Sequence, residues 1–233
     1  MEFGVLGPLT LRQDAHTTTV VGARRRALLA ALLAGRGSTV GFDELVDALW
    51  PEDPPPSARH TLHTHVSRLR TELGVHVTAQ DGGYRLTGGE ARTDADRFDL
   101  WVDQAASATD PRAVELLQDA LALWRGPAFG DGSGGRHVQG EVRRLTERRL
   151  VARELLVDRL VAAGRAPEAV QLWRFVAEAL GLEGIELAKG EVAGLHPTRS
   201  ARLSHVGGPF GALGEIDPGV LDAYGIGERV AYL

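Results

Sequence analysis

One short stretch of the sequence, residues 57–73, would place side chains able to contact DNA along one side of an expected helix. On a helical wheel its aliphatic residues form a narrow apolar stripe, while hydroxyl, imidazole and guanidinium groups occupy the far and flanking faces. Such groups donate hydrogen bonds to phosphates, and an arginine can bind a guanine edge through two of them. The polar residues of these faces are Thr61, Thr64, His65, Ser67 and Arg68. Taken alone, the pattern also fits an ordinary solvated face of an amphipathic helix.

Other chemically suggestive residues do not add up to a reactive site. His60, His63 and His65 lie close together, but no further ligand follows at the spacing that a metal site requires. The glycine-rich "GDGSGG" at 130–135 neither follows a strand nor precedes Lys-Ser/Thr, so it does not fit a phosphate-binding loop. Ser133 lacks the surroundings of a nucleophile elbow. We therefore expect no catalytic residue, no metal and no cofactor, and a protein that is not an enzyme.

The elements around the opening stretch follow the order of a winged helix. Residues 2–21 predict short strands, and helices are expected from about Arg24 to Ala34 and over "FDELVDALW". "PEDPPP" is a stiff link, Ser57 is a plausible N-cap of the third helix, and "VHVTAQDGGYRLT" predicts a hairpin. In a winged helix the third helix enters the major groove and the hairpin touches the minor groove or backbone. This order favours DNA contact over the solvated face.

The middle of the chain predicts helices, and its last fifty residues predict strands. "DADRFDLWVDQA", "PRAVELLQDALALW" and a long helix from Val138 to Ala163 are followed by a tight turn into a further helix, as in tetratricopeptide-like stacks. The arginines of the long helix alternate with acids at ion-pair spacing, which favours an exposed ion-paired face over a second nucleic-acid site. Asp94, Asp96, Asp99 and Asp103 are interpreted as solvated carboxylates near a helix start.

The predicted fold class is therefore α+β, mostly α, in three parts. An N-terminal winged helix-turn-helix is followed by a tetratricopeptide-like helical domain and a small β-containing C-terminal segment. The expected domains are residues 1–90, 91–183 and 184–233.

Bulk composition fits a globular protein in a reducing cytoplasm, with 43% hydrophobic residues, 24% charged residues and no cysteine. No apolar run approaches the roughly 20 residues needed to cross a bilayer, and the N-terminus lacks a secretory signal, so we expect a cytoplasmic protein without a membrane partner. The net charge of −5 does not by itself point to nucleic acid. A DNA-binding hypothesis must therefore depend on where individual arginines lie.

Two groups of motifs resemble a known family of bacterial activators. "GARRRALLAALLAGRGSTVGFDELVDALWPEDPPPSARHTLHTHVSRLRTELG", followed by "GGYRL", resembles the OmpR-type winged helix of the antibiotic regulatory protein (SARP) family. "DADRFDLWVDQA", "ALALWRGPAFGD" and "RLTERRLVARELLVDRLVAAGR" resemble the bacterial transcriptional activation domain of that family. Together these motifs cover residues 1 to about 182.

The resemblance implies a sequence-specific activator of a secondary-metabolite biosynthetic gene cluster. It would read the major groove of double-stranded promoter DNA, with direct repeats, through residues 57–73. It would recruit the sigma and alpha subunits of RNA polymerase and could form a homodimer on DNA. Carried over by position, the DNA-binding residues are Arg59, Thr61, Thr64, His65, Ser67, Arg68, Arg70, Tyr84 and Arg85. The loop facing the polymerase contains Trp50, Glu52, Asp53 and Pro55.

The last forty residues resemble a different family. "HPTRSAR", "GALGEIDPGVLDAYGI" and the closing "RVAYL" are similar to part of the phenylalanyl-tRNA synthetase β-chain. That part belongs to a synthetase-like fold without catalysis, so the resemblance implies no catalytic role for His196, Arg199 or Asp217. It does leave an alternative function open: an adaptor whose tail binds a translation component or tRNA.

Overall fold

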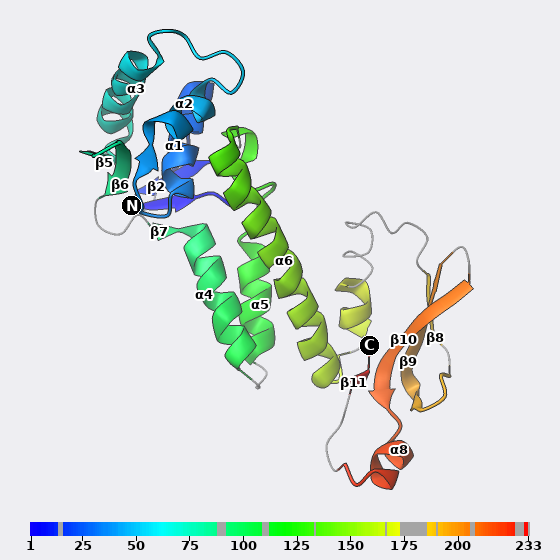
Figure 1. Ribbon diagram of the computed structural model, residues 1–233. Coiled ribbons are helices and arrows are strands. Elements are labelled where there is room, and N and C mark those ends of the chain that lie inside the picture. The colour runs from blue at the N-terminus through cyan, green and yellow to red at the C-terminus, as the bar shows by residue number, and fades with distance from the viewer. Residues whose placement is uncertain are drawn as a thin grey trace. The chain divides into compact units, whose positions relative to one another are not determined.

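The computed structural model describes residues 1–13, 16–87, 92–108, 112–132, 134–165, 167–172, 186–189, 191–205, 208–226 and 231–232 (Figure 1). The chain divides into two compact units. The first comprises Met1–Trp101 and Ala120–Arg149, and the second comprises Val102–Asp119 and Leu150–Leu233. The first unit contains every residue that the sequence assigns to DNA or to polymerase.

A four-stranded sheet opens the first unit. Its strands lie in the order β3-β2-β1-β7. They comprise β1 (Glu2–Gly4), β2 (Thr10–Gln13), β3 (His16–Thr19) and β7 (Arg92–Thr93). β7 pairs in parallel with β1, with Phe3 opposite Thr93. The segment that leads into the helical region is therefore part of the N-terminal sheet.

Three helices and a hairpin follow β3. They are α1 (Ala23–Ala34), α2 (Phe42–Leu49) and α3 (Ala58–Leu73), with β4 (Val40–Gly41), β5 (His76–Gln80) and β6 (Gly83–Thr87) in the sheet order β4-β6-β5. Ser57 precedes α3 as predicted, although its side chain makes no capping hydrogen bond. Gly74 ends α3 in the left-handed conformation at φ 64°, which glycine adopts without steric cost. The predicted order of strands, three helices and hairpin is confirmed.

The core of the winged helix is built from the apolar faces of its helices. Leu28, Leu29 and Leu32 of α1 are completely buried, and so are Leu62 and Val66 of α3. Burying one such side chain contributes about 1.5–3 kcal/mol. The apolar stripe predicted for residues 57–73 therefore packs inward, with its last member, Leu73, only half-buried.

Helices α4 (Asp94–Ser107), α5 (Arg112–Ala122) and α6 (Arg136–Ala162), with a short 3-10 turn at Gly130–Gly132, form the predicted helical region. The long helix starts two residues before the predicted Val138. A further helical turn is described at 167–172. The Asp110-Pro111 start signal and the expected helix end near Gly181 lie outside the described residues.

The glycine-rich stretch before α6 packs its backbone tightly against the winged helix. A Cβ added to Gly135, which has φ +81°, would lie 2.8 Å from the Cα of Ala48. A Cβ added to Gly130, at φ +52°, would lie 3.0 Å from the Cα of Pro8. Beside them, the Phe129 amide donates to the Val5 carbonyl at 2.6 Å. Close approach of two backbones thus explains Gly130 and Gly135 of "GDGSGG".

In the second unit, the C-terminal segment forms a sheet in the order β11-β10-β9-β8 with one short helix. Its elements are β8 (Glu186–Lys189), β9 (Leu195–His205), β10 (Gly208–Ile216), α8 (Pro218–Ala223) and β11 (Ala231–Tyr232). Asp217 caps α8 by accepting a hydrogen bond from the Gly219 amide at 2.8 Å, and the side chain of Arg199 is outside the described part. The predicted fold class is confirmed. No helix in the described part of the chain is long and apolar enough to span a bilayer.

Candidate nucleic-acid interface

The side of α3 that faces away from the core is open and polar. His60, Thr64, Ser67 and Arg68 are exposed along it, while Leu62, Val66 and Leu69 on the opposite side are at most 1% exposed. The link between α2 and α3 passes over one end of α3 as an open loop (Figure 1). The helix therefore presents hydroxyl, imidazole and guanidinium groups on one accessible surface.

Three arginines of α3 differ in how they are engaged. Arg70 donates from Nε to the Val77 carbonyl at 2.8 Å. Arg59 pairs with Asp43 at 3.0 Å, and its guanidinium lies 5.6 Å from the ring centroid of Phe42. Arg68 is exposed and forms no ion pair with any described carboxylate. Of the three, Arg68 is thus the guanidinium with the most donors left for a ligand.

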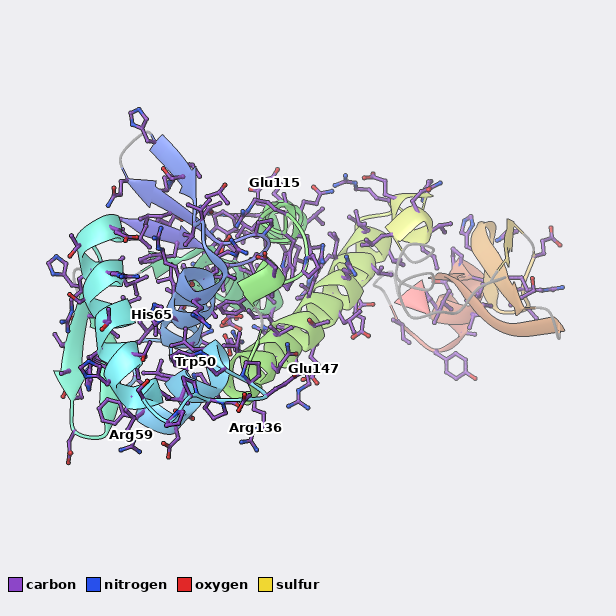
Figure 2. All side chains as sticks on the ribbon, turned by 90° about the horizontal axis from the view of Figure 1, so that it is seen from above. Trp50, Arg59, His65, Glu115, Arg136 and Glu147 are labelled. Atoms are coloured by element: carbon purple, nitrogen blue, oxygen red, sulfur yellow. The ribbon has the colours of Figure 1, made fainter. Side chains whose placement is uncertain are left out.

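His65 lies on the flank of α3 and is turned toward α2. Its ring centroid is 6.0 Å from that of Trp50, and its Nε2 is buried without a hydrogen-bond partner in the described structure (Figure 2). Burial, and then the charges of Arg24 and Arg68, lowers the pKa of His65 below its ordinary value of 6.5. The prediction of an outward imidazole at His65 is corrected, because the ring packs against Trp50. Thr61 is also half-buried, and its hydroxyl lies 3.4 Å from that of Ser57.

Two further predicted site residues are buried. Tyr84 is 5% exposed, and its ring packs edge-to-face on Phe42 with centroids 5.8 Å apart. Trp50 is 9% exposed, and the guanidinium of Arg24 lies 5.6 Å from its ring centroid. Tyr84 therefore offers no ring surface to DNA and Trp50 none to a polymerase, because both rings are covered by neighbouring side chains.

The remaining predicted residues do lie at the surface. Arg85 is exposed on the hairpin, next to the buried Tyr84 in β6. In the loop before α3, Glu52 and Asp53 are exposed and Pro55 is half-buried. The loop thus presents two carboxylates.

His63 was missed as a site residue by sequence reasoning, which considered it only as a metal ligand. It is exposed, and its Nδ1 is hydrogen-bonded to the hydroxyl of Tyr84. No group of three or more His, Cys, Asp or Glu that could hold a metal occurs among the described residues. The wheel position of His63, next to Arg70 and within about 40° of Arg59 on the side toward the hairpin, was the available signal.

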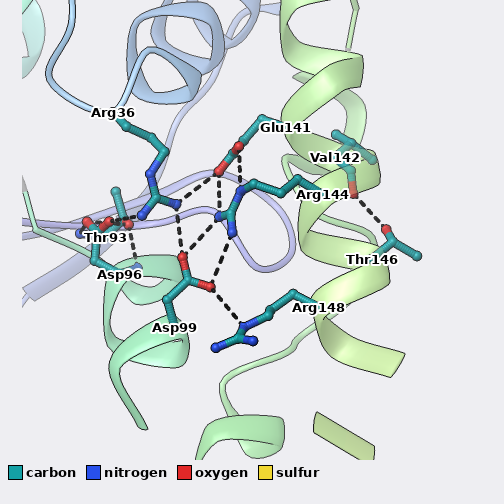
Figure 3. A network of polar contacts seen from close by, with 9 residues as sticks. All are labelled: Arg36, Thr93, Asp96, Asp99, Glu141, Val142, Arg144, Thr146 and Arg148. Atoms are coloured by element: carbon teal, nitrogen blue, oxygen red, sulfur yellow. Dashed lines mark hydrogen bonds and ion pairs between the residues drawn. The ribbon is translucent and has the colours of Figure 1, made fainter. Parts of the chain in front are cut away.

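An ionic network fixes the winged helix to the first turns of α4 and α6 (Figure 3). Arg36, just after α1, donates to Asp99 of α4 at 3.0 Å and to Glu141 of α6 at 3.2 Å. Arg144 of α6 binds the same two carboxylates, with Nε 2.8 Å from Glu141 Oε2 and Nη2 3.1 Å from Asp99 Oδ2. Hydrogen bonds that Arg144 donates to Glu141, and then those to Asp99, raise its pKa despite an opposing contribution from burial. Two carboxylates shared by two arginines thus link three elements.

The carboxylates of α4 are less solvated than predicted. The side chain of Asp99 is 16% exposed. Asp94 is buried and accepts the Val5 amide at 2.6 Å and the Arg125 guanidinium at 3.0 Å. The interpretation of these residues as free helix-start charges is therefore wrong for Asp94 and Asp99, because both hold the helical region to the winged helix.

Comparison with known families agrees with this arrangement. Residues 16–86 match the family described as "Transcriptional regulatory protein, C terminal", and residues 93–182 match "Bacterial transcriptional activator domain". The chain carries the domain pair of the SARP family. The resemblance seen in the sequence is thus confirmed. Residues 168–233 match "Phenylalanyl tRNA synthetase beta chain CLM domain", which confirms the second resemblance.

Individual relatives of this SARP-type chain are transcriptional regulators by name. It is 36% identical over 190 residues to transcriptional regulatory protein MoaR1 of Mycobacterium tuberculosis, covering 76% of the chain and 61% of MoaR1. It is 40% identical over 176 residues to regulatory protein AfsR of Streptomyces coelicolor, covering 73% of the chain and 18% of AfsR. A solved structure of Mycobacterium tuberculosis EmbR with a low-affinity phosphopeptide aligns with a TM-score of 0.68 and 31% identity, covering 78% of this chain and 51% of that one. The chain thus spans only part of each relative's length.

Proposed function

We propose that this protein is a sequence-specific DNA-binding transcriptional activator that reads the major groove with α3. The observation that carries the proposal is the open face of α3, where Arg68 stands exposed and without a described ion-pair partner beside Thr64 and Ser67. A bidentate contact from an arginine to guanine contributes about 1–3 kcal/mol of discrimination. The similarity to named transcriptional regulators supports the same function.

In this proposal residues 1–90 bind DNA, residues 91–183 act as the activation domain, and residues 184–233 form a separate segment. Thr64, Ser67 and Arg68 face base edges, while Arg85 on the hairpin meets the backbone of the duplex. Arg59 and Arg70 each use one guanidinium nitrogen within the protein and keep others that can donate to phosphates. Tyr84 is buried beneath this surface and contributes without its ring touching DNA.

Recruitment of RNA polymerase is assigned to the loop before α3, whose exposed Glu52 and Asp53 offer carboxylates to a basic partner surface. The sigma and alpha subunits are the proposed partners, at promoters of a biosynthetic gene cluster. Because single winged helices bind DNA weakly when few phosphates are neutralised, two copies on direct repeats are expected to act together.

The deciding experiment is a gel-shift assay with duplex DNA enriched from a random-sequence pool by the wild-type chain. Arg68→Ala is expected to abolish the shift without changing the melting temperature, because the side chain is exposed and holds no described partner. Arg143→Ala, which removes an exposed charge of the same compact unit on α6, is the matched control and should bind as wild type. Undiminished binding by Arg68→Ala would remove the assigned recognition face.

The similarity of residues 168–233 to a synthetase β-chain domain favours a second candidate, an adaptor that binds tRNA or a translation component. Filter binding of bulk tRNA by the full chain tests it. Tight tRNA binding that survives Arg68→Ala, together with failure to enrich any duplex, would favour the adaptor over the activator.

A further inference from the structure

His63 is held in place from two other elements although it stands at the surface. Its Nδ1 is hydrogen-bonded to the Tyr84 hydroxyl on β6. Its ring packs edge-to-face on Tyr84, with centroids 5.9 Å apart, and on Phe42 of α2, with centroids 6.1 Å apart. An exposed side chain gains such fixed geometry only when its neighbours restrict its rotamers. The imidazole is therefore preorganised.

The hydrogen bond to Tyr84 uses one ring nitrogen and leaves the other for a ligand. When the tyrosine hydroxyl donates to Nδ1, the ring hydrogen of a neutral imidazole resides on Nε2. No described residue hydrogen-bonds Nε2 of His63, and the side chain is exposed. In this tautomer an N–H donor is available on the exposed flank of α3 that faces the hairpin.

His65 lacks the exposed Nε2 that His63 has. His65 is two positions later on α3, and its Nε2 is buried next to Trp50, so that nitrogen cannot donate to a ligand. At 100° per residue the two imidazoles leave α3 on different sides, one toward the hairpin and one toward α2. Of these two histidines, His63 is the one that can reach a duplex.

We infer that His63 contacts DNA through Nε2–H and that Tyr84 is its positioning residue, which fixes the tautomer and direction of the ring from the wing. The ligand atom is a hydrogen-bond acceptor of the duplex, either a phosphate oxygen or a purine N7. This inference rests on the proposed function. It also gives the buried Tyr84 a role in binding, because its hydroxyl ties the hairpin to the recognition helix.

A double-mutant cycle on the full chain tests the inference, with wild type, His63→Ala, Tyr84→Phe and the double variant. The probe is the duplex enriched from a random pool by the wild-type chain, with a shuffled duplex of equal composition beside it. His63→Ala is expected to weaken operator binding about tenfold. Tyr84→Phe, which keeps the packed ring, is expected to weaken it about threefold. In the double variant the loss should equal that of His63→Ala alone, since Tyr84 acts through His63.

Matched controls separate binding from folding. His16→Ala removes an exposed histidine from β3, in the sheet that does not contain the hairpin, and should bind as wild type. His63→Gln, whose amide nitrogen can take the place of Nε2, should recover part of the affinity and be insensitive to Tyr84→Phe. Melting temperatures of all variants check that the chain remains folded.

The possible outcomes distinguish the inference from the function on which it rests. A loss confined to the enriched duplex identifies a base edge, whereas an equal loss on the shuffled duplex identifies a phosphate, and either supports the contact. Wild-type affinity in folded His63→Ala, or additive losses in the cycle, overturns the inference and leaves the activator intact. Failure of the wild-type chain to enrich any duplex removes both.

Discussion

His65 shows how a single side chain on α3 can couple folding to pH. Burial, followed by the charges of Arg24 and Arg68, lowers the pKa of this imidazole in the folded chain below 6.5. The unfolded chain therefore binds a proton at a higher pH than the folded chain does. The stabilisation from a neutral His65 is present above the unfolded value and is lost as pH falls through it toward the folded pKa.

A paired comparison makes this a measurable prediction. When the pH is lowered from 7.5 to 5.5, the melting temperature of wild type should fall further than that of His65→Gln, whose side chain stays uncharged throughout. Subtracting the two curves removes the contribution of the other histidines. An NMR titration of the His65 ring in the folded chain should place its pKa below 6.5. A midpoint at or above that value, with parallel stability curves, would mean that the ring is not buried against Trp50.

The alternation of side chains along a strand explains why the sequence prediction placed Tyr84 wrongly. Tyr84 and Arg85 are neighbours in β6, where successive side chains point to opposite faces of the sheet. Both could not face DNA, and the buried Leu86 places Tyr84 on the inner face with it. This alternation of inward and outward side chains could have been predicted from the sequence "GYRL". The burial of His65 by Trp50 was not, because it depends on how α2 packs against α3.

Among the elements, α1 to α3 and the hairpin were predictable because local signals agree there. The apolar stripe of α3, the prolines before it and the positive-φ Gly74 after it all point to the same boundaries. The glycines before α6 carried no such signal. Gly135 lies close to Ala48, far away in sequence, and only the packed structure reveals that its missing side chain makes room for another backbone.

Two glycines near the start of α6 should respond to alanine in opposite ways. Gly135 combines φ +81° with a Cβ position 2.8 Å from the Ala48 Cα, so Gly135→Ala should lower the free energy of unfolding by more than about 1 kcal/mol. Gly140 lies within α6, and a Cβ added there meets no atom within 4 Å. Gly140→Ala should therefore raise it by about 0.5–1 kcal/mol. Chemical denaturation of both variants beside wild type measures the difference. Equal effects of the two changes would show that Gly135 does not pack against Ala48 of α2.

Across the first compact unit, the winged helix and the first turns of α4 and α6 are held together by charges distant in sequence. Arg36 lies 63 positions from Asp99 and 105 from Glu141, so no local pattern could have paired them. Asp99 was expected in water and Glu141 was expected to pair only along its own helix, whereas both also pair with Arg36 of the DNA-binding domain. Fewer of its charges are thus free for DNA than the sequence suggests.

The charge balance of the DNA-binding domain predicts how its affinity depends on salt. Residues 1–90 contain nine arginines and ten acidic residues, and Arg12, Arg25, Arg26, Arg36 and Arg59 are already paired with carboxylates. If about two to four phosphates are neutralised by one domain, log Kobs should fall with log salt with a slope of about −2 to −4. Arg68→Ala should reduce that slope by about one, and Arg143→Ala should leave it unchanged.

If the slope is this small, tight binding is expected to need a second copy of the chain on the same duplex. A duplex with two direct repeats should bind far more tightly than one with a single site, with a slope about twice as steep, because two domains then release counterions. Fluorescence anisotropy at several salt concentrations, with one-site and two-site duplexes, measures both quantities. A steep slope on the one-site duplex, or no gain from the second repeat, would show that one domain neutralises more phosphates than its unpaired arginines allow.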